Sequence, residues 1–216
     1  LSAKKDELKH YISDCKIKLI ISSNTYNNQK VIPKSNGLNI IEIEKINIKE
    51  RKHLPSIKSE RKAMILYTSG TTNKPKGVVT SHMNVESQIT TLVEAWEWNQ
   101  EDHIPLFLPL HHIHGIINSL SCPLFIGAKV TMMGPFDTEK VCSQVASNDF
   151  TVFTAVPTIY FSLIEKLESS NNKKLFKGFK KMRLMMSGSA ALAPEIHKKW
   201  KELTGQELLE RYGMTE

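Results

Sequence analysis

Residues 67–77 read Tyr-Thr-Ser-Gly-Thr-Thr-Asn-Lys-Pro-Lys-Gly and lie between two short apolar runs, at 63–66 and 78–80. The runs predict two strands, the first of them buried. The loop between them contains four Ser and Thr hydroxyls, two glycines and two lysines. Glycine lets successive backbone N–H groups turn toward an anion, hydroxyls add neutral donors, and lysine adds a positive charge. This composition predicts a loop that holds a polyphosphate.

The order of residues in this loop excludes a Walker A motif. That motif places lysine directly after its second glycine, whereas Lys76 precedes Gly77. An ordinary polar turn is the alternative, because Ser, Thr, Asn, Gly and Pro all favour turns. The density of hydroxyls and lysines favours the phosphate loop.

Apolar spacing in the rest of the chain predicts strands that alternate with helices. Strands are expected at 18–22, 107–110, 129–133, 151–155, 182–187 and 207–212. Helices are expected at 1–19, 82–98, 116–126, 137–146, 157–168 and 194–203, and a charged loop at 171–181. The polar segment 24–62 is expected to hold at most one edge strand, within 38–48. This alternation predicts an α/β fold with mostly parallel sheets flanked by helices, and functional loops at the carboxyl ends of the strands.

Charge and composition narrow the classes of partner. The formal net charge is +7, from 29 basic and 22 acidic residues. Such a charge is compatible with binding either nucleic acid or small anionic molecules. No aromatic residues alternate with the lysines, so we expect no nucleic-acid partner. No apolar run reaches the length of a membrane span. The three cysteines lack the spacing of a disulfide framework or a zinc site, which favours a reducing compartment.

Three further motifs contain polar or small residues after predicted strands. They are Leu-Pro-Leu-His-His-Ile-His-Gly at 108–115, Ser-Gly-Ser-Ala-Ala-Leu at 187–192, and Glu-Arg-Tyr-Gly-Met-Thr-Glu at 210–216. Small side chains in the second motif leave room for a flat ring against the backbone. Adjacent His111 and His112, with no carboxylate nearby, do not predict a metal site. His111 and His114 are expected only to pack or to form local hydrogen bonds.

Together these motifs resemble the adenylate-forming superfamily of acyl-CoA synthetases, adenylation domains and luciferases, whose phosphate loop usually reads Y-T-S-G-T-T-G-x-P-K-G. Asn73 replaces a glycine of that loop, and asparagine tolerates left-handed backbone angles better than most residues. The resemblance implies part of the large N-terminal domain, with 1–62 as a loosely matched peripheral part and 63–216 as the nucleotide- and acid-binding part. It also implies that the C-terminal domain is absent, so the isolated segment is expected to complete neither adenylation nor thioester formation.

The resemblance also implies roles for individual residues. Those expected to bind ATP are Thr68, Ser69, Gly70, Thr71, Thr72, Lys76, Gly77, Ser189, Ala190, Ala191, Glu210, Tyr212, Gly213, Met214 and Thr215. The catalytic residues would be Lys76, His112, Thr215 and Glu216. Thr68 and Glu216 would hold Mg²⁺, which favours a single carboxylate together with phosphate oxygens.

The expected substrate is a small carboxylic acid, activated with ATP to an acyl-adenylate and then transferred to CoA. His112 and Ser189 are expected to line its site, and Arg211 could bind a second carboxylate through its planar fork. The alternative for Arg211 is a surface salt bridge with Glu210 or Glu216. Several stretches resemble malonyl-CoA synthetases, including a mitochondrial animal type, which implies malonate or methylmalonate as the acid. A medium-chain or aryl acid, a non-catalytic nucleotide-binding role, and a cytoplasmic location remain the alternatives.

Overall fold

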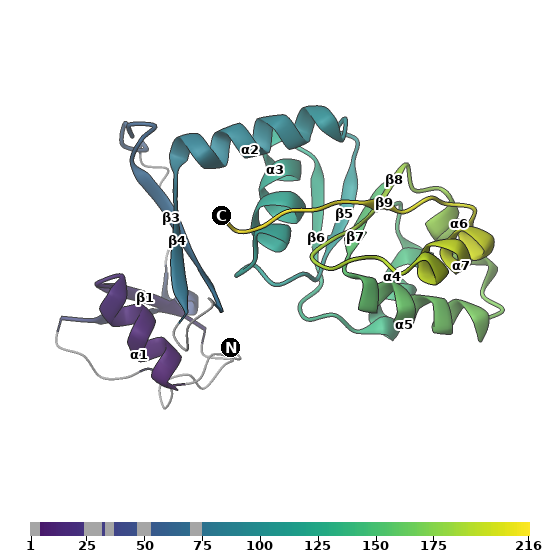
Figure 1. Cartoon of the computed structure of the whole chain (residues 1–216), viewed down its shortest axis with the longest axis horizontal. Coiled ribbons are helices and arrows are strands. Elements are labelled where there is room, and N and C mark those ends of the chain that lie inside the picture. The colour runs from purple at the N-terminus through teal and green to yellow at the C-terminus, as the bar shows by residue number, and fades with distance from the viewer. Residues whose placement is uncertain (1–4, 24–31, 33–36, 47–52, 70–74) are drawn as a thin grey trace. The chain divides into compact units, whose positions relative to one another are not determined.

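The computed structural model describes residues 5–23, 32, 37–46, 53–69 and 75–216. The chain divides into two compact units, Leu1–Ile57 and Lys58–Glu216, and Figure 1 shows the elements of both.

The first unit contains one helix and a small parallel sheet. Helix α1 (Lys5–Asp14) buries Ile12. Strand β1 (Leu19–Ser22) pairs in parallel with β2 (Asn39–Glu42), and a short 3₁₀ helix, η2 (Ile43–Lys45), follows. The predicted strand at 18–22 and the edge strand within 38–48 are therefore confirmed. The predicted helix is confirmed over a shorter range.

The second unit opens with a hairpin that flanks the glycine- and lysine-containing loop. Strands β3 (Lys62–Thr68) and β4 (Lys76–Ser81) pair antiparallel, with Thr68 opposite Lys76. The expectation that the first of these strands is buried is wrong, because Ile65 is 37% exposed. Successive side chains of a strand point to opposite faces, and here Met64 packs toward the core while Ile65 points away from it.

Helix α2 (His82–Ala95) starts directly at the end of β4, because Ser81 and Asn84 form a reciprocal cap. The Ser81 hydroxyl accepts a hydrogen bond from the Asn84 N–H at 3.1 Å, and the Asn84 side chain accepts one from the Ser81 N–H at 2.9 Å. Glutamate is common at the third helical position of such a capping box, and asparagine occupies that position here. The cap leaves no loop between the hairpin and the helix.

The remaining elements form the α/β body of the unit. The strands are β5 (His103–Leu106), β6 (Lys129–Met132), β7 (Val152–Ala155), β8 (Leu184–Ser187) and β9 (Leu209–Glu210). The helices are a π-helix η3 (His114–Ser121), α3 (Cys122–Ile126), α4 (Thr138–Ser147), α5 (Pro157–Glu168), α6 (Lys173–Lys180) and α7 (Pro194–Thr204). Strands β5 and β6 pair in parallel, and β7, β8 and β9 form a second parallel sheet in that order. The predicted α/β fold is confirmed.

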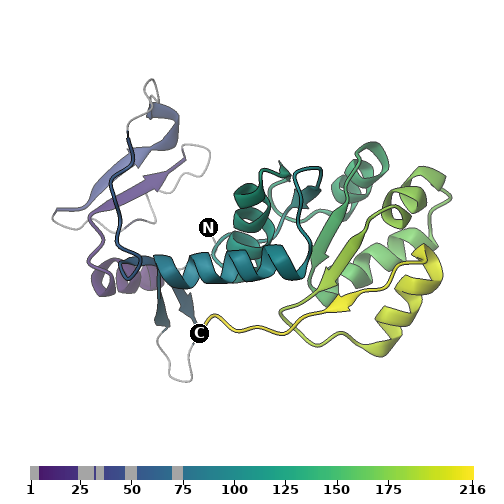
Figure 2. The same cartoon turned by 90° about the horizontal axis from the view of Figure 1, so that it is seen from above.

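Helices pack on both faces of these strands, as Figures 1 and 2 show. The side chains of β7 alternate: Phe153 and Ala155 join a core with α4, α5, α6 and α7, whereas Val152 joins a core with α2, η3 and α3. The same alternation in β8 places Met185 in the first core and Met186 in the second. This period of two also directs Thr154 toward η3.

Three element predictions are wrong in position or type. The strand expected at 107–110 lies at 103–106, where Pro105 sits inside β5, a position that sequence reasoning avoids because proline has no N–H for a ladder. The charged loop expected at 171–181 contains α6, whose N-terminus is capped by the Asn172 side chain. The last strand, expected at 207–212, is limited to Leu209–Glu210.

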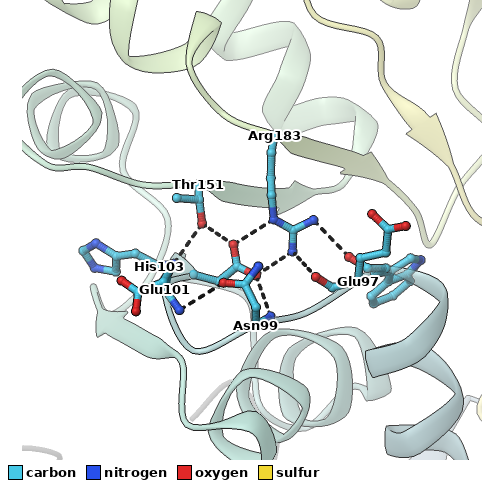
Figure 3. Close-up of polar contacts among 8 residues, drawn as sticks. Glu97, Asn99, Glu101, His103, Thr151 and Arg183 are labelled. Carbon is cyan, nitrogen blue, oxygen red and sulfur yellow. Dashed lines mark hydrogen bonds and ion pairs between the residues drawn. The ribbon is translucent and has the colours of Figure 1, made fainter.

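An ion pair between buried Asp102 and partly exposed Arg183 joins the end of α2 to the sheets (Figure 3). Asp102, which is 2% exposed, accepts from Arg183 Nε at 2.8 Å and from the Thr151 hydroxyl at 2.7 Å. Arg183 also donates to the carbonyls of Trp96 and Glu97, at 3.0 and 3.1 Å, just beyond the C-terminal end of α2. A cation is favourable at that end of a helix, so Arg183 both pairs with Asp102 and caps α2.

The three cysteines differ in burial. Cys122 and Cys142 are buried, Cys15 is half-buried, and none is in a disulfide. Among the helices that the structure describes, none has both the length and the apolar character that crossing a bilayer would require.

Candidate functional site

The loops after β8 and β9 meet at the carboxyl edge of the parallel sheet. The N–H of Arg211 donates to the carbonyl of Ser187 at 2.9 Å. The Glu210 carboxylate accepts from the N–H of Leu192 at 2.8 Å. These two bonds join the small-residue turn at 187–192 to the segment at 210–216. The edge is where parallel α/β sheets ordinarily bind ligands.

Arg211 lies across this edge with its side chain half-buried. A Cβ on Gly188 would come within 2.9 Å of Arg211 Cγ and Nε, and one on Gly213 within 3.2 Å of Nη1. Glycine at both positions therefore lets the guanidinium lie against the backbone. Within the described part of the chain Arg211 is in no ion pair, so the alternative of a salt bridge with Glu210 or Glu216 is not observed. Burial lowers the pKa of Arg211, but a guanidinium stays protonated in proteins.

His114 lies beside Arg211 and bridges two elements. Its Nδ1 is 3.0 Å from the hydroxyl of Ser189, and its Nε2 is 2.6 Å from that of Thr154. Ser189 holds a left-handed backbone angle, φ +69°, which is uncommon for a residue other than glycine. Burial, and then the positive charge of Arg211, lower the pKa of His114 to about 3. The imidazole is therefore neutral at physiological pH.

The other residues expected around the base and the acid are mostly exposed. Tyr212 is 88% exposed and Met214 is 63% exposed. Thr215 is half-buried, while Ala190, Ala191, Gly213 and Glu216 are exposed. His112 is exposed, with its ring 4.4 Å from that of His111. None of the hydrogen bonds or ring contacts in the described structure joins His112 to Ser189 or Arg211.

The loop predicted to hold phosphate is described only at its two ends. Gly70, Thr71, Thr72 and Asn73 lie outside the described residues. Thr68 and Lys76 are paired across the hairpin, and Ser69, Lys76 and Gly77 are exposed. In both views the segment after β9 runs back toward this hairpin (Figures 1 and 2). Between the described ends of the loop and Thr215 or Glu216 there is no hydrogen bond or ion pair.

Sequence reasoning missed three residues at this site: His114, Asn118 and Thr154. His114 was expected only to pack or to bond locally, yet it reaches Ser189, 75 positions along the chain. The available signals were polar residues inside apolar runs: Asn118 within Ile-Ile-Asn-Ser-Leu and Thr154 within Val-Phe-Thr-Ala. A polar side chain inside a buried element requires a partner, which these residues find in each other and in Arg211.

Among the curated proteins to which this chain is similar, several are named malonate–CoA ligase. Human malonate–CoA ligase ACSF3, mitochondrial, is 47% identical over 163 residues, which is 71% of this chain and 28% of that protein. The Xenopus laevis protein of the same name is 38% identical over 229 residues, covering 97% of this chain and 40% of the relative. The chain thus spans well under half the length of these relatives.

Comparison with solved structures gives the same result. A malonyl-CoA ligase in ternary product complex with methylmalonyl-CoA and AMP matches with a TM-score of 0.86 and 32% identity, over 99% of this chain and 45% of that one. ATP-bound MatB from Rhodopseudomonas palustris matches with a TM-score of 0.80 and 29% identity, over 100% of this chain and 44% of that one. The model of the AMP-binding enzyme family matches residues 2–216. This chain belongs to the AMP-binding enzyme family.

Proposed function

We propose that the protein is an acid–CoA ligase that activates a small dicarboxylic acid, malonate or methylmalonate, with ATP. The observation that carries the choice of acid is Arg211, a half-buried cation with no carboxylate partner among the described residues. His114 beside it is neutral, so the site offers one uncompensated positive charge. A substrate that brings one carboxylate beyond the reacting one matches that charge. The names of the human and frog relatives support the same acid.

In the proposed reaction the substrate carboxylate attacks the α-phosphorus of ATP and expels pyrophosphate. The thiolate of CoA then attacks the acyl-adenylate, which yields the thioester and AMP. Positioning and neutralisation of phosphate charge dominate such steps. Lys76 and the hydroxyls of Thr68 and Ser69 are the groups of the described hairpin suited to the β- and γ-phosphates. Thr215 would contact the α-phosphate.

The adenine would lie between the small-residue turn and Tyr212. Ser189, Ala190 and Ala191 present no large side chain, and the Tyr212 ring is 88% exposed and open to stacking. Glu210, also expected at the nucleotide, accepts from Leu192 N–H through one carboxylate oxygen, which leaves the other oxygen for the nucleotide. It would support the base site by holding the turn in place.

Mg²⁺ fits the donor set at the end of the chain. Thr68 offers one hydroxyl, and Glu216 offers one carboxylate that is in no ion pair among the described residues. Mg²⁺ usually takes one or two carboxylates plus substrate phosphates and retained waters. When bound it would neutralise phosphate charge. Glu216 would hold it, and Thr68 would orient it from the hairpin.

The test is an acid panel with the full-length protein. Pyrophosphate release and thioester formation are measured with malonate, methylmalonate, propionate, octanoate and benzoate. We expect malonate or methylmalonate to be preferred, and Arg211→Leu to lower kcat/KM for that acid by about 100-fold, since a charge-assisted bidentate contact is lost. Equal activity on octanoate or benzoate would refute the choice of acid. ATP binding without turnover of any acid would favour the non-catalytic alternative.

A mitochondrial location is part of the proposal, because the human and frog relatives are named as mitochondrial. Fractionation of cells that express the tagged full-length protein tests it. Recovery in the cytosol alone would exclude it.

A further inference from the structure

Asn118 is a buried polar side chain in contact with Arg211. It is 1% exposed and lies in the π-helix η3 among apolar neighbours. With its amide oxygen facing the guanidinium, it accepts from Arg211 Nη2 at 2.7 Å and from Nε at 3.3 Å. The opposite orientation would set the amide nitrogen against those donors, so the hydrogen bonds assign the amide.

The π-helix presents Asn118 and His114 together. Hydroxyls hold its wide turns, since Ser119 donates to the carbonyl of His114 and Ser121 to that of Ile116, both at 2.7 Å. Gly115 fixes its start, because a Cβ there would lie 2.2 Å from the carbonyl oxygen of Pro109. π-Helical turns are frequent at functional sites.

The contact leaves the carboxylate-binding edge of Arg211 available. A guanidinium has five N–H donors in a fixed fork. Asn118 accepts hydrogen bonds from Nε–H and from one N–H of Nη2, and these two donors form the side edge of the guanidinium. The terminal edge, formed by Nη1 and the second N–H of Nη2, has no partner among the described residues. That edge matches a carboxylate with two parallel hydrogen bonds.

The neutrality of Asn118 is as important as its position. An aspartate has nearly the same shape, but it would neutralise Arg211 and compete with an incoming anion. We infer that Asn118 is a positioning residue that orients Arg211 and, by remaining uncharged, makes the site select dicarboxylic over monocarboxylic acids. This inference rests on the proposed function.

The experiment uses the full-length protein with four single variants. Asn118→Asp adds the opposing charge, Asn118→Leu removes the acceptor without adding charge, and Arg211→Leu removes the cation. Asn171→Asp is the control, because Asn171 is exposed just before α6 and the change adds the same charge away from Arg211. For each variant, KM and kcat are measured for malonate, propionate and ATP, and the melting temperature checks folding.

We expect Asn118→Asp to raise KM for malonate by about tenfold or more and to lower the malonate-to-propionate ratio of kcat/KM by a similar factor. The KM for ATP should stay at its wild-type value. Asn118→Leu should raise KM for malonate by a smaller factor, because Arg211 keeps its charge but loses its orientation. Asn171→Asp should match the wild type. In the double variant with Arg211→Leu, the effect of Asn118→Asp should vanish, since the two residues act as one unit.

The outcomes separate the two proposals. If Arg211→Leu lowers the ratio but both Asn118 variants keep it, the role of Asn118 is refuted and the proposed function stands. If Arg211→Leu keeps the ratio, both are refuted. If Asn118→Asp lowers kcat/KM for malonate and propionate equally, Asn118 is merely structural and the inference fails.

Discussion

At the residue scale, His114 shows how burial sets a charge. Its two ring nitrogens lie against the hydroxyls of Ser189 and Thr154, which can donate or accept, so a neutral imidazole is satisfied in either tautomer. A protonated ring would lie buried next to Arg211, which explains its pKa of about 3. The fold therefore favours the neutral form over the whole physiological range.

This shift predicts a pH dependence of stability. Between pH 6.5 and about 3 the unfolded chain binds a proton at His114 that the folded chain excludes, so stability falls as the pH falls through this window. Replacing His114 with Gln should make the slope of unfolding free energy against pH shallower, by up to about 1.4 kcal/mol per pH unit. Denaturant titrations between pH 7.5 and 4.5 measure the slope. Identical slopes for variant and wild type would contradict the prediction.

Asp102 predicts a second stability effect at the residue scale. Burial alone would raise its pKa, but hydrogen bonds from Arg183, Thr151 and Asn99 hold the pKa below its usual range. Asp102→Asn weakens the hydrogen bonds that Arg183, which is partly exposed, makes to a buried carboxylate, and should lower the free energy of unfolding by roughly 2 kcal/mol at neutral pH. The difference should shrink in acid, because the stability from a depressed carboxyl pKa is present above its unfolded value and is lost as the pH falls through the folded one.

The matched control is Asp149→Asn, which breaks the ion pair with Lys181. That carboxylate is 98% exposed, so little stability should be lost. Urea unfolding at neutral pH compares the two variants. An equal loss for both would show that burial of the Asp102 carboxylate has no special effect.

At the element scale, α6 and α4 pack closely enough to require a glycine. A Cβ on Gly178 would lie 2.4 Å from the carbonyl oxygen of Val145 in α4 and 2.8 Å from its Cγ1. The close approach brings Leu175 and Phe179 of α6 into the core, where both are fully buried. Gly178 lowers the intrinsic helix propensity of α6 but allows close contact between α6 and α4.

Gly178→Ala should therefore destabilise the protein. Helix propensity alone predicts a gain of about 1 kcal/mol, whereas overpacking against α4 predicts a loss of about 1–3 kcal/mol. We expect the loss to dominate, because the clash is with backbone. Lys177→Ala, at the exposed neighbouring position, is the control and should change stability very little. Thermal unfolding compares the melting temperatures of the two variants with that of the wild type. A higher melting temperature for Gly178→Ala would contradict the packing argument.

Sequence predicts a helix or strand well when the residues that determine it are close together along the chain. The Pro-initiated helices α5 and α7 and the Asp137 cap of α4 were predictable, because proline and cap residues act within one turn. Helix α6 was missed because its five exposed or flanking lysines suggested a loop, whereas its stability comes from Leu175 and Phe179 in the core. Strand β5 was displaced because tertiary packing tolerates Pro105.

At the scale of the whole molecule, the two units have unequal cores. Both hydrophobic clusters draw their buried side chains from residues after Lys58, whereas Ile12 and Ile32 are the buried apolar residues described before it. All three tryptophans, Trp96, Trp98 and Trp200, also belong to the second unit. The larger unit therefore has the interior that a cooperative fold needs.

Removal of residues 1–57 should leave the second unit folded. We expect the near-ultraviolet circular dichroism from its tryptophans to persist, together with one cooperative thermal transition. The chain of 216 residues, measured in the same way, is the reference for the shortened chain. A featureless near-ultraviolet spectrum for the shortened chain would show that the first unit is required for folding.

The candidate site was partly predictable at this scale. Motif resemblance predicted a site at Ser189, Arg211 and the segment after β9, because short motifs at strand ends are local in sequence. It could not find His114, Asn118 or Thr154, whose importance depends on contacts between η3, β7 and the loop after β9. Such contacts between distant segments follow from the topology rather than from any one motif.

The burial of two cysteines has a practical consequence. Burial raises the pKa of Cys122 to about 12 and that of Cys142 to about 11, so neither is a thiolate at neutral pH. A maleimide dye added to the native protein should therefore attach at the half-buried Cys15, in the first unit. Because every tryptophan lies in the other unit, dye and indole fluorescence would report on the unfolding of the two units separately.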